Sequence, residues 1–414
     1  MEKKLMLGNE AVARGLYENG VHVSTAYPGT PSTEISEYAA KYDEIYAEWS
    51  PNEKVALEVA IGASVGGARA FCAMKHVGLN VAADPLFTLS YTGVTGGMVI
   101  CVADDPGMHS SQNEQDSRHY AIAAKVPMLE PADSGECLSF AKAALELSEQ
   151  FDTPVFLRTC TRIAHSQSIV TLGERVVPER KPYQKNPQKY IMAPANAIRR
   201  HPEVEKRTQA LTEFAETCPF NRMELLGDRK LGIITSGTSY QYVKEVFGDR
   251  VSVLKLGLIH PLPVKLIQKF AASVERVVVV EELDPIIETH CKSIGVAVEG
   301  KSLFPITGEF SQKLIASVVL KQDTQTAVQP QENIPVRPPV MCAGCPHRGM
   351  FYTLAKNKVT VLGDIGCYTL GSAAPLNALD STLCMGASVS GLHGFNKAGG
   401  KESEQKTVCV IGDS

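Results

Sequence analysis

The chain has 414 residues, of which 44% are hydrophobic and 21% are charged, and its formal net charge at pH 7 is −4. This length accommodates two or three domains of ordinary size, each with its own hydrophobic core. The small net charge and the lack of a polybasic tract argue against nucleic acid or an anionic membrane as a partner.

The amino-terminal segment and the cysteines indicate the compartment. The segment MEKKLMLGNEAVARGLYENG turns polar after two lysines and lacks the apolar core and cleavage site of a signal peptide. No apolar run approaches the ~20 residues that a membrane-spanning helix needs. We therefore expect a cytoplasmic protein without a membrane, whose eleven cysteines are mostly thiols.

The first 165 residues alternate short apolar strands with amphipathic helices. Three predicted strands are HVSTAYPGTPS at 22–32, where a Gly/Pro turn follows, MVICVADD at 98–105 and TPVFLRTCT at 153–161. Between the first two lies the helical pattern NEKVALEVAIGASVGGARAF at 52–71. Strands that alternate with helices predict an α/β fold, a doubly wound parallel sheet with helices on both faces.

The rest of the chain divides into four segments. Residues 166–225 include the aperiodic, Pro- and Lys-rich stretch VPERKPYQKNPQKY, which predicts an extended linker. Residues 226–322 predict a second, smaller α/β unit, and 323–340 a second Pro-rich linker. A third α/β unit begins at 341 and is still in its opening strands at 414, so the sequence predicts serial α/β domains.

The segment MCAGCPHRG at 341–349 places Cys342 and Cys345 at CxxC spacing, and Cys367 follows in GDIGCYTLG. Thiolates at this spacing can share a metal or cluster, or form a redox disulfide. A zinc knuckle is less favoured because the second CxxC pair is missing. The residues could equally shape a tight turn that faces a cofactor, and the sequence leaves these interpretations open.

Two further features gain meaning only from their surroundings. The turn YPGTPSTE at 27–34 presents Thr30 and its backbone amides beside a helix N-terminus, which attracts anions. Glu53 lies in the first turn of its predicted helix, where the helix dipole stabilises a carboxylate. Taken alone, the turn is more simply explained as an ordinary turn with a capping residue, and Glu53 as an ordinary acidic residue in the first turn of a helix.

In combination, these motifs resemble a known family. The helix NEKVALEVAIGAS resembles the Glu-containing helix of the pyrimidine domain in thiamine diphosphate enzymes, and YPGTPS resembles a turn of 2-oxoacid:ferredoxin oxidoreductases. The order CAGC, GDIGC, CMGAS and VIGDS resembles the start of their diphosphate domain. With CPHRGMFY after CAGC, the pattern is most similar to the alpha (large) subunits of the indolepyruvate ferredoxin oxidoreductase branch.

The resemblance implies a thiamine diphosphate-binding fold and an activity. Residues 1–165 would form the pyrimidine-binding domain, 226–322 a transketolase C-terminal-like domain, and 341–414 the start of the diphosphate-binding domain. The reaction would be oxidative decarboxylation of aryl 2-oxoacids such as indolepyruvate, with coenzyme A, to aryl-acetyl-CoA and CO2. Electrons would pass through [4Fe-4S] clusters to ferredoxin. The alternatives are a non-redox thiamine diphosphate-dependent decarboxylase or carboligase, and an inactive assembly subunit.

The resemblance also implies roles for single residues. Glu53 would hydrogen-bond N1′ of the aminopyrimidine, Thr30 the substrate's keto acid group, and Arg118 its carboxylate, while His76 and Gly78 would line the thiazolium. In the diphosphate domain, the residues expected to receive the cofactor are Gly366, Cys367, Met385, Gly386 and Gly412, and Asp413 is expected to bind Mg2+. Cys342, Cys345 and Cys367 are candidate iron-sulfur ligands.

Two departures from the family pattern stand out. The family's large subunits continue with a second Mg2+ ligand and with cysteine runs that bind two [4Fe-4S] clusters, and neither is present here. We therefore expect a C-terminally truncated fragment of an alpha subunit that works with a beta subunit, as a heterodimer or a higher oligomer. A fourth ligand for a cluster at CAGC is also not identifiable.

Overall fold

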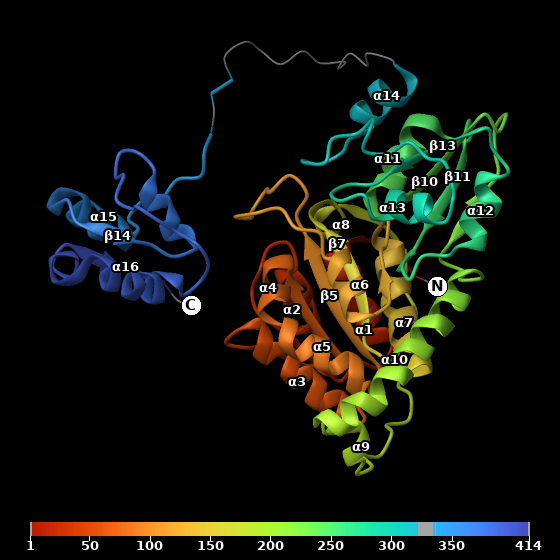
Figure 1. Ribbon diagram of the computed structural model, residues 1–414, viewed down its shortest axis with the longest axis horizontal. Coiled ribbons are helices and arrows are strands. Elements are labelled where there is room, and N and C mark those ends of the chain that lie inside the picture. Colours follow the sequence, from red (N-terminus) through yellow and green to blue (C-terminus); the bar gives the residue numbers. More distant parts are fainter. Residues whose placement is uncertain (1, 322–333, 336, 413–414) are drawn as a thin grey trace. The chain divides into compact units, whose positions relative to one another are not determined.

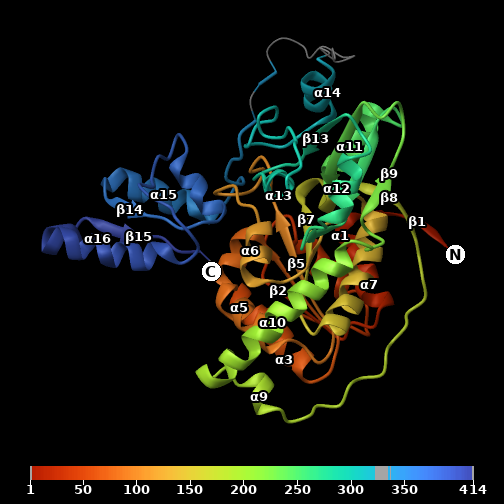
Figure 2. The same ribbon diagram turned by 45° about the vertical axis from the view of Figure 1, so that its right-hand side comes forward.

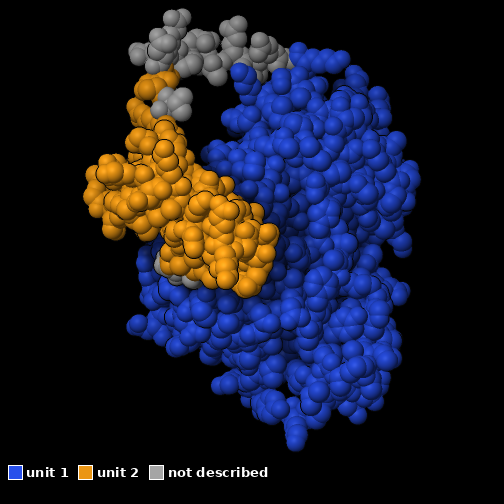
Figure 3. Space-filling view, turned by 60° about the vertical axis from the view of Figure 1, so that its left-hand side comes forward, with its two compact units in different colours: residues 1–325 blue, residues 326–414 orange. Residues whose placement is uncertain are grey.

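The computed structural model describes residues 2–321, 334–335 and 337–412. The chain forms two compact units, residues 1–325 and residues 326–414, which Figure 3 distinguishes by colour. Within the described residues, no helix is both long enough and apolar enough to cross a membrane.

A seven-stranded sheet forms the centre of the first unit (Figure 1). Its strands, in spatial order, are β12 (Leu258–His260), β6 (Met128–Leu129), β7 (Val155–Cys160), β5 (Met98–Asp104), β4 (Ala70–Lys75), β2 (Val23–Ala26) and β3 (Tyr46–Trp49). All neighbouring strands are parallel except β12, which runs antiparallel to β6.

Helices cover both faces of this sheet. One face packs against α1 (Gly8–Glu18), α2 (Thr33–Ala39) and α7 (Ser134–Phe151), and the other against α3 (Glu53–Val65), α4 (His76–Val81), α5 (Ala83–Thr92) and α6 (Arg118–Ala124). Successive residues of β4 alternate between the two cores: Phe71 belongs to the first and Cys72 to the second. This alternation follows from the period of two along a strand, and it confirms the predicted doubly wound α/β fold.

The segment 166–225 differs from its prediction. After the short helix α8 (Thr161–His165), strand β8 (Gln167–Thr171) pairs antiparallel with β1 (Lys3–Leu7), and two helices follow, α9 (Pro187–Tyr190) and α10 (Pro194–Ala215). The prediction of an extended linker is wrong for the 22 residues of α10, which Figure 2 shows next to α5.

Tertiary contacts explain why α10 is helical despite its internal Pro202. Its buried positions Val204, Leu211 and Ala215 recur at helical spacing. Arg207 donates from Nη2 to the Ser90 carbonyl at 2.7 Å and from Nη1 to the Asp152 carbonyl at 2.8 Å. The helix is thus fixed by contacts with residues more than 50 positions away, which local composition does not reveal.

A second, four-stranded sheet has the order β13 (Arg276–Val280), β10 (Leu231–Ser236), β11 (Ser252–Leu256) and β9 (Arg222–Glu224). The first three strands are parallel, and β9 is antiparallel to β11. Two apolar cores flank the sheet, one with α11 (Gly237–Phe247) and α14 (Gln312–Leu320), the other with α12 (Lys265–Ala271) and α13 (Ile286–Ser293). Strand β12 lies between β11 and α12 in sequence but pairs with β6 of the first sheet, so the chain connects the two sheets directly.

The second unit is small. It contains α15 (Pro346–Asn357), β14 (Thr360–Leu362), a 3-10 helix over Cys367–Ser372, α16 (Ala387–Glu404), which is interrupted at Gly400, and β15 (Thr407–Cys409). Strands β14 and β15 are parallel neighbours. Its core includes Met341, Phe351, Val361 and Tyr368.

Candidate active site

Most of the predicted site residues of the first unit gather at the carboxyl ends of neighbouring parallel strands. The turn 27–34 follows β2, the residues His76–Gly78 follow β4, and the loop 105–117 follows β5. In open α/β sheets, ligands bind outside the carboxyl ends of the strands. The topology therefore places these segments where such a sheet binds its ligands.

Glu53 begins α3, as predicted. Asn52 caps the helix by accepting a hydrogen bond from the Val55 amide at 3.0 Å, which fixes the first turn and the starting direction of the Glu53 side chain. Glu53 is only 9% exposed, and burial raises the pKa of its carboxyl group. A buried carboxyl with a raised pKa is suited to sharing a proton with a ring nitrogen near neutral pH.

Gly78 lies directly against this carboxyl group. A Cβ atom at position 78 would lie 2.4 Å from Oε1 and 2.7 Å from Cδ of Glu53. Any side chain there would displace the carboxyl group. Gly78 thus permits the close approach of α4 to Glu53, which is consistent with its predicted place beside the cofactor.

His76, in the first turn of α4, is 1% exposed. Its Nε2 lies 3.3 Å from the Asn113 carbonyl oxygen in the loop 105–117. Burial lowers the pKa of the imidazole, so His76 is neutral at physiological pH. The structure therefore places His76 near Gly78 and Glu53 as an uncharged group.

Thr30 is exposed at the tip of the turn 27–34. The turn is held from within, because Ser32 donates from its amide and from its hydroxyl to the Gly29 carbonyl, both at 2.8 Å, and the Gly29 amide donates to the Thr33 hydroxyl at 2.9 Å. These bonds present Thr30 to solvent at the same sheet edge as Lys75–Gly78.

Arg118 does not fit its predicted role. Its side chain is 1% exposed, and its guanidinium group forms ion pairs with Asp116 at 2.6 Å and with Glu281 at 2.7 Å. Nη2 also donates to the carbonyls of Glu282 and Asp284 at 2.9 and 2.8 Å. The interpretation as a substrate-carboxylate ligand is therefore corrected: Arg118 links the first sheet to the segment after β13.

The Arg118 ion pairs belong to a larger buried network. Arg158, on β7, pairs with Asp104 at 2.7 Å and with Glu130, and its longer ion pair with Asp116 at 3.8 Å joins it to the Arg118 set. We call the six residues of these two sets the buried ion network: Asp104, Asp116, Arg118, Glu130, Arg158 and Glu281. Local sequence patterns do not reveal this network, because its partners lie far apart in the chain.

In the second unit, the predicted diphosphate residues converge at one end of β14 and β15. Asp364 follows β14, is fully buried, and accepts a hydrogen bond from the Gly386 amide at 2.7 Å. Gly386 has φ of +83° and directly precedes α16, so a glycine suits the turn into that helix. Asp364 holds the start of α16, and sequence reasoning had not singled it out.

Tyr368 closes the space over two of the predicted glycines. Cβ atoms at Gly366 and Gly412 would lie 2.6 and 2.0 Å from its ring, and its hydroxyl donates to the Ile365 carbonyl at 2.9 Å. Cys367 and Met385 are exposed. The predicted Mg2+ ligand Asp413 lies outside the described residues.

The three candidate iron-sulfur cysteines are not assembled as ligands. Cys342 and Cys367 are exposed and Cys345 is half-buried, with its Sγ 3.4 Å from Nδ1 of His347. Among the described residues, no group of three or more His, Cys, Asp or Glu side chains is arranged to hold a metal ion. We therefore assign no iron-sulfur cluster to the CAGC segment.

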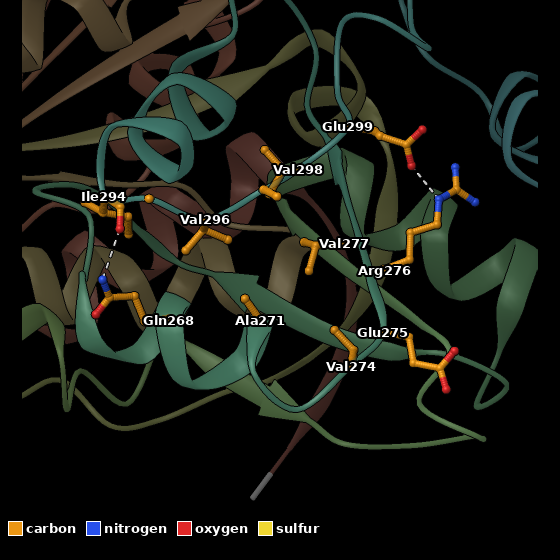
Figure 4. Close-up of a pocket in the computed structure, with 12 residues that line it drawn as sticks. Gln268, Ala271, Val274, Glu275, Arg276, Val277, Ile294, Val296, Val298 and Glu299 are labelled. Atoms are coloured by element: carbon orange, nitrogen blue, oxygen red, sulfur yellow. Dashed lines mark hydrogen bonds and ion pairs between the residues drawn. The ribbon is translucent and has the colours of Figure 1, made fainter.

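A separate groove of about 620 Å³ lies beside β13, one of the two edge strands of the second sheet (Figure 4). Apolar side chains such as Val277, Val296 and Val298 line it, and Arg276 and Glu299 form an ion pair at its rim. None of the predicted site residues lines this groove, so it is distinct from the candidate active site.

Comparisons with known proteins identify the class. The family model "Pyruvate flavodoxin/ferredoxin oxidoreductase, thiamine diP-bdg" matches residues 14–217. Among solved structures, the chain resembles 2-oxoglutarate:ferredoxin oxidoreductase from Magnetococcus marinus with a TM-score of 0.66, at 19% identity over 77% of this chain and 65% of that one. The first unit thus has the thiamine diphosphate-binding fold of the 2-oxoacid oxidoreductases, as predicted.

Curated relatives identify the family. The chain is 41% identical to the indolepyruvate oxidoreductase subunit IorA of Archaeoglobus fulgidus and 42% identical to that of Pyrococcus horikoshii. Both alignments cover 100% of this chain and 70% of the relative. The chain therefore belongs to the family of the indolepyruvate oxidoreductase subunits IorA, and the members of this family are 2-oxoacid oxidoreductases. This confirms the family that the sequence motifs predict.

Proposed function

We propose that the chain is the thiamine diphosphate-binding part of an enzyme that oxidatively decarboxylates aryl 2-oxoacids. In the balanced reaction, an aryl 2-oxoacid, coenzyme A and two oxidised ferredoxins give an aryl-acetyl-CoA, CO2, a proton and two reduced ferredoxins. The carbon–carbon bond to the carboxylate breaks, a thioester bond forms, and ferredoxin receives two electrons. A beta subunit and [4Fe-4S] clusters complete the proposed assembly.

The observation that carries the proposal is the setting of Glu53. Its carboxyl group is buried at the start of α3, has a raised pKa, and lies against a position where only glycine fits. These features suit an aminopyrimidine ring, which needs a carboxyl partner for its N1′ atom in a site shielded from water. The names of the curated relatives support the aryl substrate.

The residues of the first unit divide the remaining tasks. Glu53 would hold the proton at N1′, Gly78 would leave room for that contact, and neutral His76 would border the reacting region without adding charge. Thr30 would donate a hydrogen bond from its hydroxyl group to the keto acid group of the substrate. Thiamine diphosphate, when bound, supplies the carbon nucleophile and the electron sink that decarboxylation requires.

The residues of the second unit suit the diphosphate. The start of α16, with the Gly386 amide oriented by Asp364, is a helix N-terminus of the kind that binds phosphate groups. Asp413 is the proposed Mg2+ ligand, since a carboxylate oxygen is a preferred ligand of that ion.

The proposal is tested with Glu53→Gln in the complete enzyme. Glutamine keeps the size of the side chain but cannot hold the proton, so we expect kcat for indolepyruvate to fall about 100-fold or more. Glu58→Gln is the matched control, because Glu58 lies on the same helix with a side chain that is 49% exposed. CO2 release, ferredoxin reduction and circular dichroism are measured for both variants.

The outcomes discriminate between the candidate functions. Normal turnover by the Glu53→Gln variant would contradict the assignment of the site. Decarboxylation without electron transfer to ferredoxin would favour a non-redox decarboxylase or carboligase. Lack of turnover by the wild-type enzyme with any 2-oxoacid would favour an assembly subunit.

A further inference from the structure

Lys75 is a buried cation at the candidate active site to which neither the motifs nor the comparisons assign a role. It ends β4 and directly precedes α4, and it is 6% exposed. Its stem packs against the turn 27–34, because a Cβ atom at Gly29 would lie 3.0 Å from the Cβ of Lys75. Lys75 thus lies between the turn that presents Thr30 and the residues that contact Glu53.

The ammonium group of Lys75 has little to balance its charge. Its Nζ donates to the backbone carbonyl of Ser110 in the loop 105–117. Within the described residues, no carboxylate oxygen lies within 4.0 Å of this Nζ. A charge that is removed from water without a counter-ion is costly, and burial lowers the pKa of Lys75 accordingly.

Asp105, the acid whose charge acts on Lys75, has other partners. Its Oδ2 accepts from the Ser110 amide at 2.8 Å and from the Ser111 hydroxyl at 2.6 Å, and its Oδ1 accepts from Thr161 at 2.6 Å. These bonds fix the start of the loop 105–117. Asp105 therefore attracts Lys75 at a distance but does not pair with it.

Other cations near the site are unsuitable for binding an anion there. Arg118 is committed to Asp116 and Glu281. Lys54 follows Glu53 in sequence, but its side chain is 44% exposed and pairs with Glu58 and Asp84 at the surface. Lys75, unlike these two cations, combines burial, an unfilled capacity for ion pairing and a place beside Glu53, Gly78 and Thr30.

We propose that the ammonium group of Lys75 binds the carboxylate of the 2-oxoacid substrate. This inference rests on the proposed function for the substrate class but assigns a residue that the function did not require. An anion at Lys75 would replace the missing counter-ion and accept a charge-assisted hydrogen bond. The diphosphate of the cofactor offers similar chemistry, and the experiment separates the two sources.

The test compares Lys75→Met with Lys54→Met in the complete enzyme. Methionine keeps the apolar stem and removes the charge, so we expect KM for phenylpyruvate to rise about 10- to 150-fold, as for loss of a hydrogen bond to a charged group. The Kd of thiamine diphosphate should change less than threefold, and Lys54→Met should change neither constant. In a Lys75→Ala variant, added propylammonium should restore a part of the affinity for phenylpyruvate, and sodium should not.

Each outcome decides the proposal. An unchanged KM in a folded Lys75→Met variant overturns it, and a large rise in the Kd of thiamine diphosphate with little change in KM assigns Lys75 to the diphosphate instead. Pyruvate and 2-oxoglutarate are assayed in parallel, since every 2-oxoacid has the carboxylate. Turnover of these acids but not of phenylpyruvate would contradict the aryl specificity. The KM values of the Lys75→Met variant for these acids would then decide the role of Lys75. If no acid is turned over, calorimetric Kd values for phenylpyruvate decide the role of Lys75.

Discussion

Two regions of the first unit bury charge in different ways. In the buried ion network, Arg118 has two carboxylate partners at ion-pair distance and Arg158 has three. In the candidate active site, Glu53 has a raised pKa and Lys75 donates to a backbone carbonyl instead of a carboxylate. The comparison teaches that a buried charge with protein partners holds the fold together, whereas a buried charge without a counter-ion indicates the place of a ligand.

The largest expected effect breaks the buried ion network. Arg118→Met removes the guanidinium group, so Glu281 is buried without its cation and Asp116 keeps only the longer ion pair with Arg158, at 3.8 Å. The free energy of unfolding should therefore fall by about 3–5 kcal/mol. Urea denaturation measures the change. Lys206→Met is the control, because Lys206 is 71% exposed and pairs with Glu203 at the surface, and we expect no measurable change. A stable Arg118→Met variant would show that the network contributes little.

A smaller effect is expected from Gly78→Ala, which changes the active site and not the network. The added Cβ would overlap Glu53 Oε1, at 2.4 Å, and displace the carboxyl group. A misplacement of about 1 Å costs about 100-fold in rate, so we expect kcat to fall by that order. Gly62→Ala, on α3 with no atom within 4 Å of its new Cβ, should keep full activity. If the two variants were equally active, the close contact of Gly78 with Glu53 would not be needed for the function of Glu53.

The smallest effect concerns a single carboxyl group beside the network. Burial raises the pKa of Glu282 from 4.5 to about 7. Because the folded state prefers the protonated form, this group destabilises the fold progressively as the pH rises from 4.5 to about 7, and the penalty is constant above that range. Glu282→Gln should therefore raise Tm more at pH 7.5 than at pH 4.5. An equal Tm difference at the two values would contradict the raised pKa.

The sequence predicts well what repeats locally. The apolar run MVICVADD indicates a strand buried on both faces, which the structure forms as β5, and Asn52 before Glu53 is typical of a helix start. The helix predicted over 52–71 ends earlier, at Val65, and its last two residues belong to β4. These local signals placed Glu53 in the first turn of its helix and Thr30 on a turn after a strand. The function of both residues remains a proposal.

The sequence predicts poorly what depends on distant partners. Arg118 looks like a free arginine in NEQDSRHYA, but Glu281, its partner, lies 163 positions away. Lys75 reads as the polar end of the apolar strand AFCAMK, and only the close approach of Gly29 and Ser110 reveals that it is buried. The cysteines show that a local motif can also suggest too much. The CxxC spacing of Cys342 and Cys345 suggested a metal or cluster site with Cys367, but among the described residues no such group of side chains is arranged to hold a metal ion.

Strand β12 has a practical consequence for anyone who divides this protein. It comes from the second half of the first unit, yet it covers the outer edge of β6, a strand of two residues. A polypeptide cut near residue 165 would leave that edge open, and open edges invite pairing with other chains. The minimal piece that contains Glu53 and Lys75 and keeps its sheet closed therefore extends at least to His260, and expression of a shorter piece should yield aggregates.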